Sequence, residues 1–200
     1  MPKRVLIFAL FAVLALPLTA AAEQTTWTVD PVHSHVGFSV RHFLTPVAGQ
    51  FTDVTGTVVY DTENPANSTV DVTVQAASID THNEQRDGHL RSEDFFHAEQ
   101  YPTLSFKSKR VAKLGDDLAV TGDLTIRGVT KEVTVPVEVL GVMGAKAGFS
   151  TEFTVDRQEY GVNWNRALDQ GGTILGEEVK VTLNLEVDKQ EQASADADAE

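Results

Sequence analysis

The segment RDGHLRSEDFFHAEQYP, from Arg86 to Pro102, gathers residue types that could do chemistry. It holds two Arg, two His, several carboxylates and two adjacent Phe. Such side chains can transfer protons, bind a metal ion, hold an anion or cover an apolar ligand. Asp87 and His89 are the candidate acid–base pair, but residues two apart on a helix do not face each other. We therefore interpret the segment as a lid that its charged groups fix in place and whose Phe residues touch a ligand.

A second candidate for chemistry is the histidine pair of the segment DPVHSHV. His33 and His35 would share one face of a strand, and two such His with a third ligand can bind zinc. Ser34 would point to the opposite face, so it forms no dyad with either. No further ligand set with suitable spacing is present, and Cys is absent. The sequence therefore predicts no catalytic residue and no metal site. A metal-dependent enzyme that uses His33, His35 or His89 on a β-barrel remains the alternative.

The elements that must position these residues are mainly strands. Apolar and polar residues alternate with a period of two, which is typical of antiparallel sheet with one wetter face. Pro136 within such a stretch indicates an edge, a bulge or an unpaired position, because proline has no N–H to donate. The expected strands lie within residues 34–43, 50–61, 68–76, 103–111, 118–126, 131–139, 148–155 and 179–187.

Eight one-sided strands predict an all-β domain, either a sandwich or a closed barrel. A barrel of this size is packed solid or holds one small ligand. Its expected inward faces mix Phe residues with small ones such as Ala76 and Gly122, which permits a cavity. Residues 83–96 lack the alternation, so we expect one short amphipathic helix there, capped by Thr81 or Asn83 and covering an open end of the barrel.

The chain divides into three parts by composition. Residues 1–22 combine Lys3 and Arg4 with an apolar run and a final Ala-Ala-Ala, which is typical of a secretory signal peptide. Removing Lys3 and Arg4 from 16 basic residues leaves 14 against 29 acidic ones, a formal charge of −15. This charge excludes nucleic acid as a partner. Residues 23–187 form the folded domain, and residues 188–200 read as an acidic disordered tail.

Several motifs occur in a characteristic order: WTVDPVHSHVGFSVRH, SIDTHNEQRDGHLRSEDFFHAEQYPTLSF, GDLTIRGVTKEV, QEYGV and GEEVKVTLNLE. Together, from Trp27 to about Val187, they resemble the YceI-like family of periplasmic polyisoprenoid-binding proteins. The resemblance implies an extended eight-stranded antiparallel, lipocalin-like barrel with a helical segment near its mouth. It also implies a bound long amphiphile and no catalytic activity. His97 departs from the family, which more often has an acidic residue after the paired Phe, and the acidic tail lies outside the pattern.

From this we expect a periplasmic carrier that holds an isoprenoid-type lipid, such as a quinone, a quinone precursor or a prenyl phosphate. Secretion from the cell is the lesser alternative. The expected partners are the lipid and, briefly, a membrane; a homodimer is left open, and no cofactor is expected besides the lipid. The residues expected to line the cavity are Phe38, Val40, Phe51, Leu90, Phe95, Phe96, Leu104, Phe106, Leu124, Ile126, Phe149 and Phe153.

Polar side chains near the mouth are candidates to hold the ligand's headgroup. They are His42, Arg86 and His89, although Arg86 and His89 can equally bond to Asp87 and to loop carbonyls. Arg127 and Arg157 are expected at strand ends, where each either pairs with an acid or meets the ligand.

Overall fold

The computed structural model describes residues 25–169 and 171–190. The expected signal peptide and the last ten residues of the expected tail lie outside this part of the chain. Within it, no helix is long and apolar enough to cross a membrane. The strands are β1 Thr25–Val29, β2 His35–His42, β3 Thr45–Phe51, β4 Val54–Tyr60, β5 Thr69–Gln75, β6 Ile79–Asp80, β7 Thr103–Leu114, β8 Asp117–Ile126, β9 Val129–Met143, β10 Lys146–Asp156 and β11 Leu175–Lys189.

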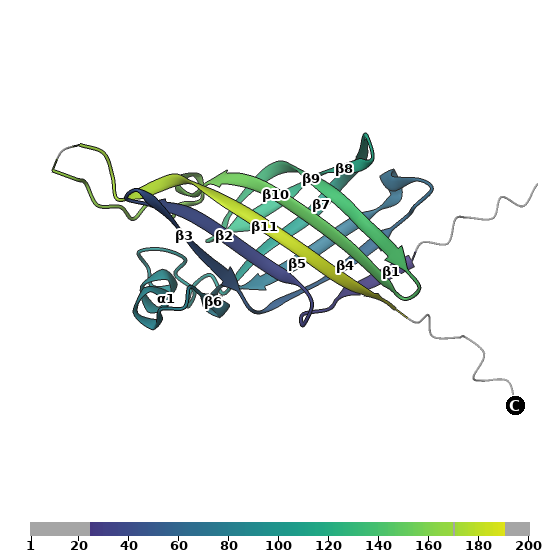
Figure 1. The fold of residues 1–200 in the computed structure, drawn as a ribbon, viewed down its shortest axis with the longest axis horizontal. Coiled ribbons are helices and arrows are strands. Elements are labelled where there is room, and N and C mark those ends of the chain that lie inside the picture. Colours follow the sequence, from purple (N-terminus) through teal and green to yellow (C-terminus); the bar gives the residue numbers. More distant parts are fainter. Residues whose placement is uncertain (1–24, 170, 191–200) are drawn as a thin grey trace, which may run out of the picture.

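Eight of these strands close into an antiparallel barrel (Figure 1). The ring runs β1, β4, β5, β7, β8, β9, β10, β11, and β11 pairs with β1 to close it. Strands β2, β3 and β6 prolong the wall, because β11 pairs with β1 at residues 187–189 and with β2 at residues 175–184. The predicted eight-stranded, lipocalin-like barrel with one helix is thus confirmed.

The pairing of β9 with β10 is interrupted. Their pairing stops after Glu138 and Ser150, although both strands continue toward the end where β11 begins. Pro136 lies just past this point and pairs with Ala119 of β8 on its other side. Its carbonyl accepts a hydrogen bond from the Thr151 hydroxyl of β10 in place of a backbone bond. The unpaired position predicted from Pro136 is therefore found where the ladder ends.

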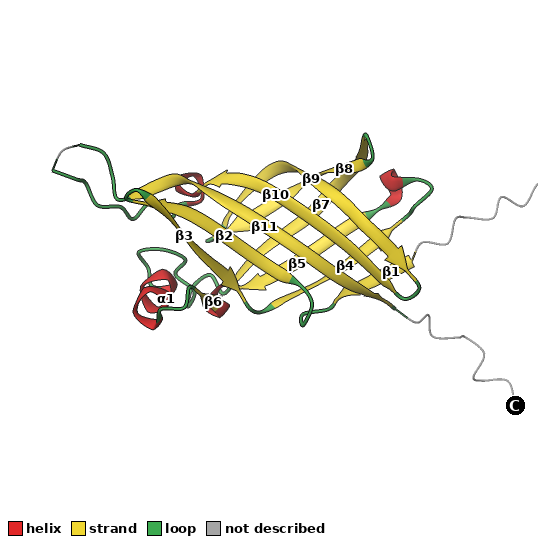
Figure 2. Ribbon diagram, viewed as in Figure 1, coloured by secondary structure: helices red, strands yellow, loops and turns green. Residues whose placement is uncertain are grey.

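The helix α1, Glu84–Arg91, lies beside β3 and β6 at one end of the barrel (Figure 2). Its N-cap is Asn83, whose side chain accepts a hydrogen bond from the Arg86 amide at 2.9 Å. The expected range of 83–96 is too long, because the chain turns at Ser92 and its N–H bonds back to His89. The three short 3-10 helices are η1 Pro65–Asn67, η2 Ala76–Ser78 and η3 Arg157–Tyr160.

The boundary predicted for the tail is also wrong by a few residues. Strand β11 includes Asp188 and Lys189, and Asp188 lies opposite Lys146 of β10. The backbone amide of Gln190 donates to the carbonyl of Thr26 in β1 at 2.9 Å. The fold therefore extends past Val187, because these residues complete the pairing that closes the barrel.

Candidate functional site

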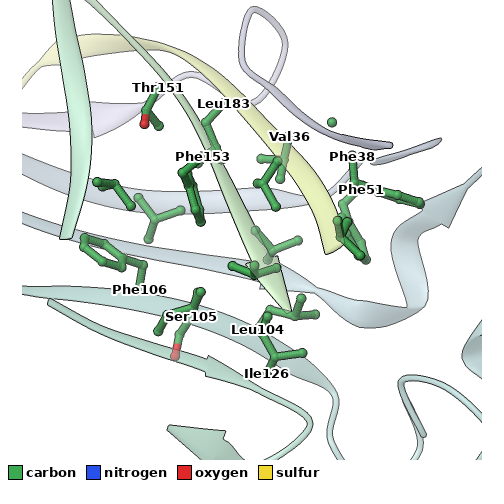
Figure 3. A pocket seen from close by; sticks show the side chains of 18 of the residues that line it. Val36, Phe38, Phe51, Leu104, Ser105, Phe106, Ile126, Thr151, Phe153 and Leu183 are labelled. Atoms are coloured by element: carbon green, nitrogen blue, oxygen red, sulfur yellow. The ribbon is translucent and has the colours of Figure 1, made fainter. Parts of the chain in front are cut away.

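An apolar cavity of about 700 Å³ lies inside the barrel. It exists because alternate residues of each strand turn inward, and most of these are Val, Leu, Ile or Phe. Figure 3 shows Phe106, Phe153 and other labelled side chains from several strands that line this space. A cavity of this volume and lining is typical of a site for a drug-sized or lipid-like ligand.

The structure places every predicted cavity residue on this lining, together with the three headgroup candidates. They come from the five strands β2, β3, β7, β8 and β10 and from the segment around α1. Phe95 and Phe96 reach the cavity from the turns after the helix and not from the helix itself. The lining includes Phe38, Val40, His42, Phe51, Arg86, His89, Leu90, Phe95, Phe96, Leu104, Phe106, Leu124, Ile126, Phe149 and Phe153.

The polar part of the lining gathers at the end where α1 lies. Thr81, Asn83 and Gln85 line the cavity there, beside Arg86 and His89. The opposite end lies near Tyr60 and Ser68, and its other lining residues are mainly valines and leucines. The cavity is thus amphipathic along its length, with a polar mouth beside α1 and a mainly apolar opposite end.

A hydrogen-bond network fixes α1 at the mouth. The buried carboxylate of Asp87 accepts from the Thr81 amide at 2.9 Å and from the Thr81 hydroxyl. Arg86 donates through Nε to the Thr81 hydroxyl and through Nη2 to the Thr81 carbonyl, both at 2.7 Å. Of the two roles left open for Arg86, bonding to a loop carbonyl is therefore present. Arg86 bonds to Thr81 and not to Asp87, and it still lines the cavity.

Two aromatic rings pack against His89 next to this network. Its imidazole meets Phe95 edge to face at 5.0 Å and Trp164 at 5.1 Å between ring centroids. Its Nε2 lies 2.8 Å from the Asp94 carboxylate. His89 therefore pairs with Asp94, and the acid–base pair with Asp87 that was considered from the sequence does not form. Phe96 packs edge to face on Phe51 of β3, with centroids 5.6 Å apart.

Arg157, for which the sequence left open pairing with an acid or meeting the ligand, lies on the cavity lining. It begins η3 and is 6% exposed. Its guanidinium donates to the carbonyls of Gly176, Val162 and Trp164, so its expected pairing with an acid is not found. Burial lowers the pKa of the guanidinium from its ordinary value. Arg127 likewise donates to backbone carbonyls. No sequence signal reveals this, since the segment after Asp156 has no periodicity.

Two small residues expected inside the cavity do not open it. Ala76 is fully buried in η2 and is not part of the lining. Gly122 lies on β8, but a Cβ there would meet the Lys107 carbonyl oxygen at 2.4 Å and Phe106 at 2.7 Å. Glycine is required at this position because a backbone bulge of β7 approaches it closely.

The histidines do not converge on one site. His33 lies in the turn before β2 and not on the strand, with its Nδ1 2.8 Å from the Asp30 carboxylate. Asp30, His33 and Glu186 form the one group in the described part of the chain that could hold a metal ion. The Lys146 ammonium lies 3.0 Å from Asp30 and 2.9 Å from Glu186, so a cation already sits among these carboxylates.

Comparisons with known proteins agree with this geometry. A family model described as "YceI-like domain" matches residues 27–187. The chain is 40% identical over 136 residues to "Protein YceI" of Escherichia coli O17:K52:H18, which covers 65% of this chain and 71% of that protein. It is 37% identical over 170 residues to "UPF0312 protein SERP2314" of Staphylococcus epidermidis, which covers 82% of this chain and 97% of the relative.

Solved structures share the fold. The crystal structure of Burkholderia cenocepacia BcnA matches with a TM-score of 0.73 at 29% identity, covering 79% of this chain and 98% of that one. A polyisoprenoid binding domain from Saccharophagus degradans matches with a TM-score of 0.65 at 14% identity, covering 84% and 100%. The second likeness concerns the fold alone. The family model spans nearly the whole barrel and every residue of the cavity lining, and the chain belongs to the family of YceI-like domain proteins.

Proposed function

We propose that this protein is a periplasmic carrier that holds a long-chain isoprenoid-type lipid in its barrel and does not convert it chemically. The observation that carries the proposal is the cavity of about 700 Å³, mainly apolar along the strands and with its charged side chains at the mouth beside α1. This arrangement fits a molecule with one long apolar tail and one polar end. The name of the Saccharophagus degradans domain as polyisoprenoid binding supports the same ligand class.

The energetics favour a carrier that releases its lipid over a protein that sequesters it. Burying a five-carbon isoprene unit from water is worth roughly 4 kcal/mol, at about 0.8 kcal/mol per CH₂. A prenyl tail in a membrane is already shielded from water, so its transfer into the barrel gains little. Net affinity then depends on packing and on the polar contacts at the mouth. Such a protein can collect its ligand from one membrane and release it to another.

Brief membrane contact is part of the proposal, and the hairpin between β2 and β3 supports it. Leu44 at its tip is 95% exposed and Phe43 is 46% exposed. His42, the residue before Phe43, lines the cavity and packs edge to face on the Phe43 ring. The apolar tip therefore adjoins the mouth through which a lipid would pass. The predicted signal peptide supports a location in the periplasm.

Solvent extraction of the purified protein, followed by mass spectrometry and metal analysis, tests the proposal. We expect a co-purifying lipid with an isoprenoid tail, close to one per chain. A stoichiometric metal without lipid would instead support the alternative of a metal-dependent enzyme. The metal-dependent alternative has less support. Among the described residues, one group could hold a metal ion, formed by Asp30, His33 and Glu186, and the Lys146 ammonium already lies between its two carboxylates.

A further inference from the structure

The cavity lining has a charge pattern opposite to that of the protein. The whole chain has 29 acidic and 16 basic residues, a net charge of −13. No Asp or Glu is among the described residues that line the cavity, whereas Arg86 and Arg157 both line it, at the mouth. Two carboxylates near the mouth are turned to protein groups: Asp87 bonds to Thr81, and Asp94 to His89.

Arg157 is the more informative of the two. Its side chain is almost fully buried, and its Nη2 has no hydrogen-bond partner among the described residues. Its three hydrogen bonds go to neutral backbone carbonyls, while Asp156 and Glu177 act on its charge only from a distance. Buried charges in proteins are normally paired with an opposite charge. This guanidinium therefore lacks a directly bonded negative group among the described residues.

Arg86 adds a second cation to the same mouth. It uses Nε and Nη2 on Thr81, which holds the guanidinium in place and leaves Nη1 without a hydrogen bond to the described residues. A fixed guanidinium loses little conformational entropy when it binds a carboxylate or phosphate. The Thr81 and Asn83 side chains, which also line the cavity, add further polar groups beside it.

We infer that the ligand's headgroup is anionic, a phosphate or a carboxylate, and that Arg157 and Arg86 select it over a neutral headgroup on the same tail. This rests on the proposed function, and it decides between the headgroups that the sequence left open. A neutral quinone or alcohol would leave the buried charge of Arg157 uncompensated. An anionic end compensates it in a medium of low dielectric, where the attraction is stronger than in water.

The test compares ligands that share a tail and differ in the headgroup. Delipidated full-length chain is titrated calorimetrically with geranylgeranyl phosphate and with geranylgeraniol, and separately with palmitate and with hexadecanol. We expect each anion to bind about 10- to 100-fold more tightly than its alcohol, which is the range for a hydrogen bond to a charged group. The larger of the two preferences identifies phosphate or carboxylate as the natural headgroup.

Variants assign the preference to the two arginines. Arg86→Gln and Arg157→Gln should reduce the preference for the anion several-fold and leave the affinity for the alcohol nearly unchanged. Arg91→Gln is the matched control, because it removes the same charge from α1 at a residue that does not line the cavity. If Arg157→Gln fails to fold, the wild-type comparison and Arg86→Gln decide the question.

Two results would overturn the inference. Both can be distinguished from the result that would overturn the proposed carrier function. Equal wild-type affinity for alcohol and anion removes the headgroup preference but leaves a lipid carrier. A preference that survives in both arginine variants shows that other groups create it. If none of the four probes binds to the folded protein, the carrier function itself is wrong.

Discussion

Tyr60 and Phe149 meet edge to face at the end of the cavity opposite to the mouth, with ring centroids 5.4 Å apart and planes at 88°. Tyr60 also lines a second, more polar pocket of about 310 Å³, together with Trp27 and Asp61. It is thus the residue shared by the two cavities. The ring of Tyr60 therefore limits how far a ligand's tail can extend from the mouth.

We expect Tyr60→Ala to admit longer tails. A methylene group is about the size of a water molecule, about 30 Å³, so the cavity of about 700 Å³ holds about 20–25 carbon atoms. Joining the second pocket would add about ten more, or two isoprene units. Native mass spectrometry of protein incubated with an equimolar mixture of polyprenols measures the longest tail retained. Tyr60→Phe is the control that keeps the ring, and an unchanged length distribution in Tyr60→Ala would contradict the role of this residue.

Asp87 should matter more for the lid than its neighbours on α1. Asp87→Ala leaves the Thr81 amide and hydroxyl without their buried acceptor, at a cost of about 1–3 kcal/mol. We expect faster hydrogen exchange in α1 and poorer retention of lipid. Asp87→Asn keeps one acceptor oxygen and should have a smaller effect. Glu84→Ala, at an exposed position of the same helix, should change neither measurement. Similar effects from Glu84→Ala and Asp87→Ala would argue against this anchoring.

The strands could be predicted from the sequence because one face of each strand lines the apolar cavity and therefore carries apolar residues. Val36, Phe38, Val40 and His42 alternate with smaller or polar residues, and all four line the cavity. A period of two fixes the face that each residue occupies, so most of the lining follows directly from the pattern.

What the sequence missed depends on contacts between distant segments. Trp164 reaches the mouth through an irregular connection whose course no periodicity encodes, and the same connection decides between the two roles that were left open for Arg157. Gly122 faces inward, as predicted. A register shift in β7 between Ser108 and Arg110 nevertheless brings the β7 backbone against it, so this glycine opens no space. For α1, the spacing of Leu90, Phe95 and Phe96 predicts a helix that continues to Phe96, whereas the helix ends at Arg91 with Ser92 as its C-cap.

The apolar hairpin tip gives a prediction for lipid transfer. Leu44→Asp should lower the rate at which the protein takes a fluorescent prenyl lipid from vesicles by about 10-fold or more, because inserting an exposed Leu is worth about 1.5–3 kcal/mol. Met143→Asp is the matched control: Met143 is 81% exposed on the hairpin between β9 and β10. That hairpin adjoins the end of β11 opposite to the mouth. Equal slowing by both changes would show that the tip has no special role.

The turn at Asp30 makes stability depend on pH. The hydrogen bond to Asp30 raises the pKa of His33, and the same bond, with that from Lys146, lowers the pKa of Asp30. Because the pKa of His33 is higher in the folded protein, its protonation stabilises the fold. This contribution is complete below the pKa of His in the unfolded chain, about 6.5. It is lost as the pH rises through the higher pKa of the folded state. The contribution of Asp30 is instead lost in acid, as pH falls through its lowered pKa.

We therefore expect Asp30→Asn to bring the pKa of His33 down toward its ordinary value, measured by NMR titration of the imidazole. Glu186→Gln is the comparison variant, because its carboxylate lies 4.0 Å from His33 against 2.8 Å for Asp30. It should lower the His33 pKa by less. A His33 pKa that is the same in all three proteins would show that the Asp30 contact is not formed in solution.

The end of β11 contributes to stability through contacts of residues 188–190. Chains that end at Val187 and at Gln190 differ in these contacts alone. Asp188 pairs with Lys146 at 2.8 Å, and Lys189 donates its amide to the Ala145 carbonyl at 2.9 Å. Gln190 donates its amide to Thr26 at 2.9 Å. A chain that ends at Val187 loses all three, whereas one that ends at Gln190 keeps them. At about 0.5–1.5 kcal/mol for each hydrogen bond, the shorter chain should melt about 5–10 °C lower. Differential scanning calorimetry of the two chains measures this, and equal melting temperatures would mean that the barrel closes without these residues.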